Sequence, residues 1–358
     1  MLTAITFALI LTSAVVVHEL AHYFNARSVG VEVRAFSVGI GPVLARRRWR
    51  GTEWRLSLLP LGGYVDLPGM APKVAENGEL QHADEGMAKK GLAAKLWVLI
   101  GGVIANYILG CLLIAWAVSM QPAYYELISG QPVAVHGSSI ELVSPDSAAE
   151  ALGLQPGDVI MAVNGISQPN PDRVVEQVRS ADALALTIDR AGSVITRETP
   201  WPPLGAADPP LLGIQIAALV DSVSFAQVLP QAFSWGIRVI PEMVRGFVTG
   251  FAAAISGGAN SDVAGPVGMV TMVNQATNVG LAPVVLLAAV INLSLAVFNL
   301  LPIPGLDGGR MLLATVVALR GKPFKPGQEE QFHFFGIMAV LALIVLITFR
   351  ELGALFSG

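Results

Sequence analysis

Residues 2–23 read LTAITFALILTSAVVVHELAHY, an apolar run that ends in two histidines and a glutamate. A stretch of this length and composition is sufficient to cross the hydrocarbon core of a bilayer as an α-helix. The basic first region of a secretory signal peptide is missing, because no Lys or Arg precedes the apolar residues. Since the run also leads directly into the polar cluster, we expect a retained membrane-spanning helix.

The composition extends this interpretation to much of the chain. Of 358 residues, 53% are hydrophobic and 13% are charged, which is roughly half the charged share of a soluble domain. The net charge of −4 indicates no basic surface for nucleic acid, and the single cysteine permits no intramolecular disulfide. Three more runs can span a bilayer, at about Leu96–Met120, Leu281–Phe298 and Phe332–Phe349. We therefore expect a polytopic α-helical membrane protein with about four transmembrane helices.

Positive charge in the connections predicts the orientation of these helices. The first connection, from Arg27 to Lys95, carries 11 Lys and Arg residues, whereas the much longer second one carries six. The short third connection is again basic, with Arg310 as its first cation. Lys and Arg collect in cytoplasmic loops. The first and third connections should therefore face the cytoplasm, and the second connection and both termini should lie outside.

Parts of the connections have the composition of folded segments. In the first, alternation over Val31–Leu44 and Trp54–Leu67 predicts a membrane-associated hairpin, joined by the basic turn Arg46–Gly51. In the second, Ser222–Ser256 has the apolar spacing of a helix packed on the membrane face or against the spans. Lys73–Gly91 and Thr199–Pro210 are expected to be loops. We expect four parts: a first half of the membrane core at 1–120, an α+β domain at 121–220, an amphipathic, membrane-associated helical segment at 221–280 and a second core half at 281–358.

The cluster His18-Glu19-Leu20-Ala21-His22 has the spacing of a zinc-binding helix. Histidines four residues apart share one helical face and can bind one Zn²⁺ ion. A glutamate beside them can take a proton from a metal-bound water. An isolated histidine is usually a satisfied core residue, but here three costly polar side chains share one turn of an apolar helix. We predict that His18 and His22 are metal ligands and that Glu19 is catalytic.

The third ligand is expected far along the chain, since no suitable His or Glu follows closely. Asp307 lies in the stretch NLLPIPGLDGG at 299–309, directly after the third apolar run. Its two prolines end the helix, and irregular backbone at membrane depth is tolerated only inside protein or beside a wet cavity. The alternative is a loop-capping aspartate beyond the membrane. If the first and third runs both cross from outside to inside, the histidines and Asp307 reach a similar depth.

These motifs resemble the site-2 protease family of intramembrane zinc proteases, in particular the bacterial regulator-of-sigma-E protease type. The resemblance covers essentially the whole chain and includes the segments Phe36–Pro42 and Pro60–Val65. It implies one zinc ion held by His18, His22 and Asp307, with Glu19 as general base. It also implies that the strand containing Gly62, Gly63 and Tyr64 lies beside the active site and pairs with an unwound substrate.

Residues 153–165 resemble part of a PDZ domain, through GLQPGDVI at 153–160 and VNG at 163–165. Two features depart from the family pattern: one such domain is visible where two often occur, and Arg310 follows the Gly-Gly pair where a histidine is frequent. The resemblance favours exclusion of substrates with a bulky outer portion as the role of the domain. Binding of peptide ends at a sheet edge is the alternative.

Several residues have two readings. Asn292 and Asn299 share one helical face, where they either bond a neighbouring helix or bind substrate backbone or a developing oxyanion; the resemblance favours Asn299. Tyr64 is either an interfacial anchor or a substrate contact. Asn106 is interpreted as a helix-packing residue. Three histidines lack ligand spacing and are assigned no role: His82, His136 and His333.

The leading expectation is cleavage of single-span membrane proteins, such as an anti-sigma factor, in the bacterial cytoplasmic membrane. The active site would face the cytoplasm and the PDZ-like domain the outside, with substrate and lipid bilayer as partners. A catalytically silent PDZ scaffold is the first alternative, and Glu19 argues against it because a structural zinc site needs no such carboxylate. A metal transporter is the second alternative. Its metal ligands would be distributed along a transport path, whereas the candidates here form one three-ligand cluster.

Overall fold

The computed structural model describes residues 2–70, 73–74, 80–130, 135–203, 210–256 and 264–357. The chain divides into two compact units. Unit 1 comprises Met1–Ala117 and Leu229–Gly358, and unit 2 comprises Val118–Val228. Unit 1 therefore assembles from both ends of the chain, and unit 2 from one continuous segment.

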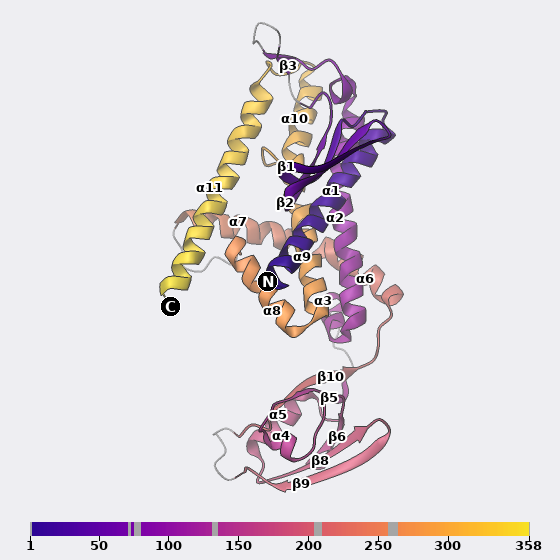
Figure 1. Cartoon of the computed structure of the whole chain (residues 1–358), viewed down its shortest axis with the longest axis vertical. Coiled ribbons are helices and arrows are strands. Elements are labelled where there is room, and N and C mark those ends of the chain that lie inside the picture. Colours follow the sequence, from indigo (N-terminus) through magenta and orange to yellow (C-terminus); the bar gives the residue numbers. More distant parts are fainter. Residues whose placement is uncertain are drawn as a thin grey trace. The chain divides into compact units, whose positions relative to one another are not determined.

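Four helices in the described part of the chain are long and apolar enough to cross a membrane, as predicted (Figure 1). Several of them extend beyond the expected apolar runs because nothing in the polar flanks breaks them. The first ends at Ser28, where Gly30, with a φ of 71°, allows the Val31 N–H to bond the Ala26 carbonyl and close the helix end. The four are α1 (Leu2–Ser28), α2 (Leu92–Met120), α9 (Leu281–Leu300) and α11 (Gln328–Ser357).

The two strands of the first connection lie closer to the turn than expected, and the prediction of a strand is wrong for Val31–Arg34, which precede the first strand. β1 (Ala35–Trp49) and β2 (Thr52–Asp66) meet at a two-residue turn, Arg50-Gly51, in which both φ angles are positive. Such a turn matches the twist of the strands, so both strands continue up to it. The prediction that Arg46–Gly51 is a turn is wrong for Arg46–Trp49, which lie in β1 and pair with Thr52–Arg55.

The second strand folds back on the first. Ala35–Val38 of β1 pairs with Glu53–Leu56 on one side and with Gly63–Asp66 on the other. This arrangement places Gly63–Asp66 at an edge of the sheet. A Cβ added to Gly63 would lie 3.8 Å from Cγ of Glu19, so the edge segment runs directly beside α1 (Figure 1).

The predicted helix over Ser222–Ser256 forms two helices instead of one. These are α6 (Phe225–Arg238) and α7 (Ile240–Ser256). Pro241 explains the break, because it has no N–H to donate to the preceding turn and is tolerated only in the first turn of a helix. After α7, the helix α8 (Pro266–Val279) starts at Gly265. Glu351 of α11 accepts the N–H groups of Gly265, Val267 and Gly268, at 2.6, 3.1 and 3.1 Å, and thereby caps α8.

The two expected loops are described only in part. Between Lys73 and Gly91 the structure has the short pair β3 (Lys73–Val74) and β4 (Leu80–Gln81) and a 3-10 turn at Gly86–Lys89, while 75–79 lie outside the described residues. In Thr199–Pro210, residues 204–209 lie outside them, and the first two residues end a strand.

Unit 2 is built on an antiparallel sheet of six strands. The strand order is β10-β5-β6-β8-β9, with β7 paired to β6, so β10 lies at one edge. The core is aliphatic apart from the buried Trp201, and Ile160 and Leu186 are fully buried in it. The elements are α3 (Tyr125–Ser129), β5 (Val135–Val143), α4 (Ala148–Ala151), β6 (Val159–Val163), β7 (Ile166–Ser167), α5 (Pro171–Ser180), β8 (Ala183–Arg190), β9 (Ser193–Pro200) and β10 (Ile214–Val220).

Candidate metal centre

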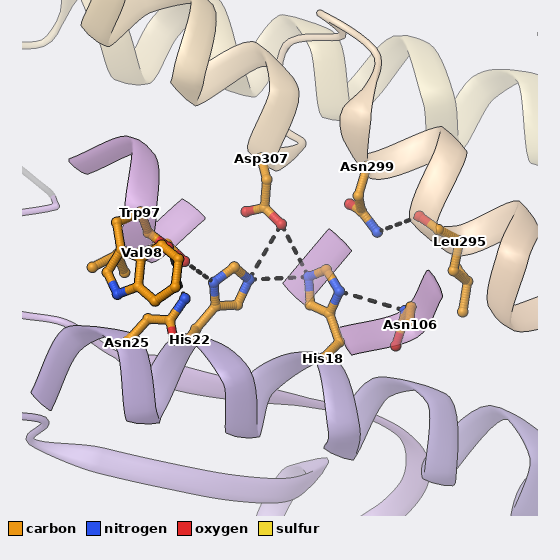
Figure 2. Close-up of polar contacts among 9 residues, drawn as sticks. All are labelled: His18, His22, Asn25, Trp97, Val98, Asn106, Leu295, Asn299 and Asp307. Carbon is orange, nitrogen blue, oxygen red and sulfur yellow. Dashed lines mark hydrogen bonds and ion pairs between the residues drawn. The ribbon is translucent and has the colours of Figure 1, made fainter. Parts of the chain in front are cut away.

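His18, His22 and Asp307 converge, although 285 or more residues separate the aspartate from the histidines (Figure 2). His18 Nε2 lies 3.0 Å from His22 Nε2 and 3.0 Å from Asp307 Oδ2, and His22 Nε2 lies 3.2 Å from the same oxygen. Both histidines are buried, and Asp307 is half-buried. The three ligand atoms therefore form a nearly equilateral triangle inside the protein.

The turn between α9 and α10 (Asp307–Arg320) presents the aspartate. Asp307 is the first residue of α10, which is packed tightly against the end of α9. A Cβ added to Gly308 would lie 2.5 Å from the Leu300 carbonyl oxygen, and one on Gly309 would lie 2.7 Å from the Ile303 carbonyl carbon. Glycine at both positions is what allows the chain to reverse so closely.

The triangle fits a zinc ion by donor type and by size. Two imidazole nitrogens and one carboxylate oxygen are a common zinc donor set, with bonds of about 2.0–2.2 Å. In a tetrahedral site such bonds place neighbouring ligand atoms about 3.3 Å apart, close to the observed 3.0–3.2 Å. Among the described residues, this is the one cluster of three His, Cys, Asp or Glu side chains with such spacing. An open fourth position would suit catalysis.

Hydrogen bonds on the far side of each imidazole orient the ligand nitrogens. Nδ1 of His22 lies 2.8 Å from the Val98 carbonyl oxygen, so Nδ1 carries the proton and Nε2 keeps its lone pair (Figure 2). The amide of Asn106 lies 3.5 Å from Nδ1 of His18, and its Oδ1 has no partner. Exchanging the amide O and N, which are assigned from the bonding network, would let Oδ1 accept from Nδ1–H and orient His18 in the same way.

Sequence reasoning missed this role of Asn106, which it assigned to helix packing. The available signal was an amide inside the very apolar helix α2, but the sequence alone did not indicate which neighbour it would meet.

A cavity of about 410 Å³ opens beside the triangle. Glu19 lines it together with both histidines and Asp307. Val65 of the edge segment lines the same cavity. Tyr64 and Asn299 also line the cavity, so a ligand inside it would contact the metal cluster, the carboxylate and the sheet edge at once.

The predicted substrate-binding residues are not all close to the cluster. Asn299 lines the cavity but donates to the Leu295 carbonyl of its own helix at 3.0 Å (Figure 2). Asn292 is buried, donates to the Ala288 carbonyl at 2.8 Å and does not line the cavity. The hydroxyl of Tyr64 accepts a hydrogen bond of 2.7 Å from Arg55. Gly63 lies against α1, and Gly62 packs against Ile40.

Comparison with known proteins gives a consistent result along the chain. The sequence model of peptidase family M50 matches residues 6–343. A predicted zinc metalloprotease of Agrobacterium fabrum is 30% identical over 372 residues, covering 99% of this chain and 96% of that protein. A predicted zinc metalloprotease of Rhizobium meliloti is 32% identical over 371 residues, which cover 98% of this chain and 96% of that protein. A predicted protease of Enterococcus faecalis is 25% identical, covering 99% and 100%.

Proposed function

This chain belongs to peptidase family M50, the site-2 proteases, and from that premise we propose that His18, His22 and Asp307 hold the zinc ion of this metalloendopeptidase, with Glu19 as general base. The observation that supports the assignment is the triangle of two imidazole nitrogens and a carboxylate oxygen, 3.0–3.2 Å on each side. The protein is a multi-pass membrane protein, and its family implies membrane-protein substrates.

The side chains in the cavity divide the chemistry of peptide hydrolysis between them. Zinc, when bound, lowers the pKa of a water ligand and polarises the peptide carbonyl. Glu19 accepts the proton of the attacking water and returns it to the leaving amine nitrogen. Val98 and Asn106 hold the two imidazoles in the tautomers that leave Nε2 free. Asn299 is the amide in the cavity that can donate to the carbonyl oxygen under attack.

The substrate enters as an extended segment paired with the edge Gly63–Asp66. A helical substrate hides its amides, so it must unwind before hydrolysis, and an exposed strand edge can replace the lost backbone hydrogen bonds. This edge lies beside Glu19 and the cavity, which supports the pairing. The substrates are single-span membrane proteins, for example an anti-sigma factor, in a bacterial cytoplasmic membrane.

The second unit is a PDZ-like domain on the outer side of that membrane. Its edge strand β10 and helix α5 border an apolar cavity of about 210 Å³, lined by Val174, Val178, Leu212, Ile214 and Ile216 among others. A peptide strand could add to β10 and insert an apolar side chain there. This groove favours recruitment of peptide ends, whereas the family resemblance favours exclusion of bulky substrates.

Substitution of the proposed base tests the assignment. Glu19→Gln keeps the shape of the side chain but cannot accept the proton, so we expect kcat to fall by about 10²–10⁴-fold. Zinc content measured on the purified variant should equal that of the wild type. Glu32→Gln, at an exposed glutamate of the same region, serves as the control. Cleavage of a single-span substrate by Glu19→Gln at the wild-type rate would exclude Glu19 as the general base, whereas absence of cleavage by the wild type would favour the catalytically silent scaffold.

A further inference from the structure

The turn that carries Asp307 has few N–H groups, and one of them has no acceptor within the turn. It comprises Leu301–Leu306, and Pro302 and Pro304 have no N–H group. Of the four remaining N–H groups, three are satisfied locally. Leu301 donates to Val297 and Phe298, Ile303 to Leu301, and Leu306 to Ile303. The fourth, on Gly305, has no local acceptor and must be satisfied from elsewhere.

That fourth N–H donates to a histidine on another membrane helix. Nδ1 of His333, on α11, lies 2.9 Å from the Gly305 nitrogen. Because a backbone N–H can only donate, Nδ1 must present its lone pair, and the proton of the neutral ring is on Nε2. His333 is not part of the metal cluster.

Gly305 is also the point at which the turn can most easily change its shape. Its φ is 98°, in a region that glycine adopts readily and other residues avoid. It lies two residues before Asp307, so a rotation there would move the carboxylate relative to His18 and His22. A carboxylate ligand held by a glycine-proline turn therefore requires a restraint from outside the turn.

Helix α11 packs against the turn closely enough to supply it. A Cβ on Gly336 would lie 2.6 Å from the Pro304 carbonyl carbon, and one on Gly305 would lie 2.5 Å from Cγ1 of Ile337. His333 precedes this contact by one helical turn. It also lines a cavity of about 340 Å³ that shares Met70, Leu99 and Arg310 with the cavity at the cluster.

We propose that His333 is a positioning residue for the metal centre: by accepting the Gly305 N–H, it fixes the turn that presents Asp307 to the two histidines. The inference rests on the proposed role of Asp307 as a zinc ligand. Partners of this kind, outside the ligand set, alter metal affinity or activity by about 10–100-fold when they are removed.

Paired substitutions in the full-length protein test the hydrogen bond separately from the volume of the ring. In His333→Asn, Oδ1 is bonded to Cγ as Nδ1 is in histidine, so an acceptor remains at the same place. His333→Leu removes the acceptor. Gln331→Leu makes a polar-to-leucine change at an exposed site of α11 and is the matched control. Asp307→Ala tests the ligand itself.

Zinc dissociation constants from competition with a chelator and kcat with a single-span substrate are the two measurements. We expect zinc affinity and kcat to fall by about 10–100-fold in His333→Leu, with KM unchanged because His333 is proposed to act on Asp307 rather than on substrate. In His333→Asn and Gln331→Leu, zinc affinity and kcat should stay within about threefold of the wild-type values, a much smaller change than in His333→Leu.

The remaining outcomes separate the two proposals. Wild-type zinc affinity in His333→Leu, together with zinc loss in Asp307→Ala, would overturn the positioning role and leave the metal site standing. Equal losses in His333→Asn and His333→Leu would also overturn it, because the ring rather than the acceptor would then matter. Retained zinc and cleavage in Asp307→Ala would remove the proposed metal site and, with it, this inference.

Discussion

At the scale of single residues, the absence of a side chain at Gly102 allows α2 to lie against the proposed metal cluster. Gly102 lies in α2 opposite His18, and an added Cβ would lie 2.6 Å from both ring nitrogens. Real Cβ atoms do not approach other atoms so closely. The glycine therefore lets α2 pack directly on the imidazole, with Asn106 one turn further along the helix.

Gly102→Ala should displace the His18 ring or push α2 away from α1. Either movement separates ligand atoms that must lie close together, so we expect zinc affinity and cleavage to fall by at least about tenfold. Gly246→Ala, in the interior of α7, adds a Cβ that meets no atom within 4 Å and is the control. Metal analysis after dialysis against a weak chelator measures the effect. Unchanged zinc retention in Gly102→Ala would show that the packing can relax without moving His18.

The ligand candidates could be identified from the sequence, but their supporting residues could not. His18, His22 and Asp307 are conspicuous because polar groups in or beside apolar spans are costly and need a reason. Asn106, Gly102 and His333 act through contacts between helices that are distant in the sequence. Periodicity identifies the face of a helix but does not specify which residue of another helix lies opposite, so these partners became visible only with the packing.

At the scale of secondary structure elements, pattern predicted the type of element better than its pairing. Alternation identified both strands of the hairpin, yet it did not reveal that β2 folds back to flank β1 on both sides. That fold depends on bends around glycines, such as Gly39 with a φ of 87°, whose direction alternation does not encode. The edge segment beside Glu19 is a product of this bend.

An ion pair in unit 2 links strand β8 to the turn before β6. Asp158 is almost completely buried and accepts 2.7 and 2.8 Å bonds from the Arg190 guanidinium, and a 2.8 Å bond from the Gln155 N–H. The hydrogen bonds from Arg190 hold the pKa of the Asp158 carboxyl below its usual range. Bidentate pairs of this kind are among the stronger hydrogen bonds in proteins.

Asp158→Asn should therefore destabilise unit 2, by about 2–3 kcal/mol near neutral pH, since Arg190 loses its charged partner. A carboxyl whose pKa is lowered by folding stabilises the protein above its unfolded pKa, and this contribution is lost as the pH falls through the folded value. The variant and the wild type should accordingly converge in acid. Hydrogen exchange at β6 and β8 in the full-length protein measures the difference, with Glu198→Gln on the exposed face of β9 as the control. If the stability difference between the wild type and Asp158→Asn persisted at low pH, the charge of Asp158 would not be its cause.

At the scale of the whole molecule, the first question is which side of the membrane each connection faces. The cytoplasmic assignment of the first connection depends on its 11 basic residues, compared with six in the much longer second one. A reporter fused near Lys89 should register as cytoplasmic, and one near Gly192 as external. The reverse pattern would place the metal cluster toward the outer face and would contradict the proposed orientation.

The second question is what unit 2 does for cleavage, and its two candidate roles predict opposite effects. If the domain excludes bulky substrates, deleting residues 122–218 should permit cleavage of a substrate with an untrimmed outer portion and spare the trimmed form. If the domain recruits peptide ends through the groove between α5 and β10, the deletion should raise KM for the trimmed substrate.

A charge placed in the groove distinguishes these roles without removing the domain. Leu211 lines the groove and is 66% exposed, so Leu211→Lys should leave the fold intact while disfavouring an apolar peptide end. Val194→Lys makes the same change on β9, outside the groove, at a residue that is 69% exposed. Because the groove is open and apolar, we expect Leu211→Lys to raise KM for trimmed substrate several-fold, roughly 1 kcal/mol of lost apolar burial, with kcat unchanged. If the deletion permits cleavage of untrimmed substrate and Leu211→Lys leaves KM unchanged, exclusion is favoured. Equal increases in KM from the two lysine substitutions would exclude a specific role for the groove.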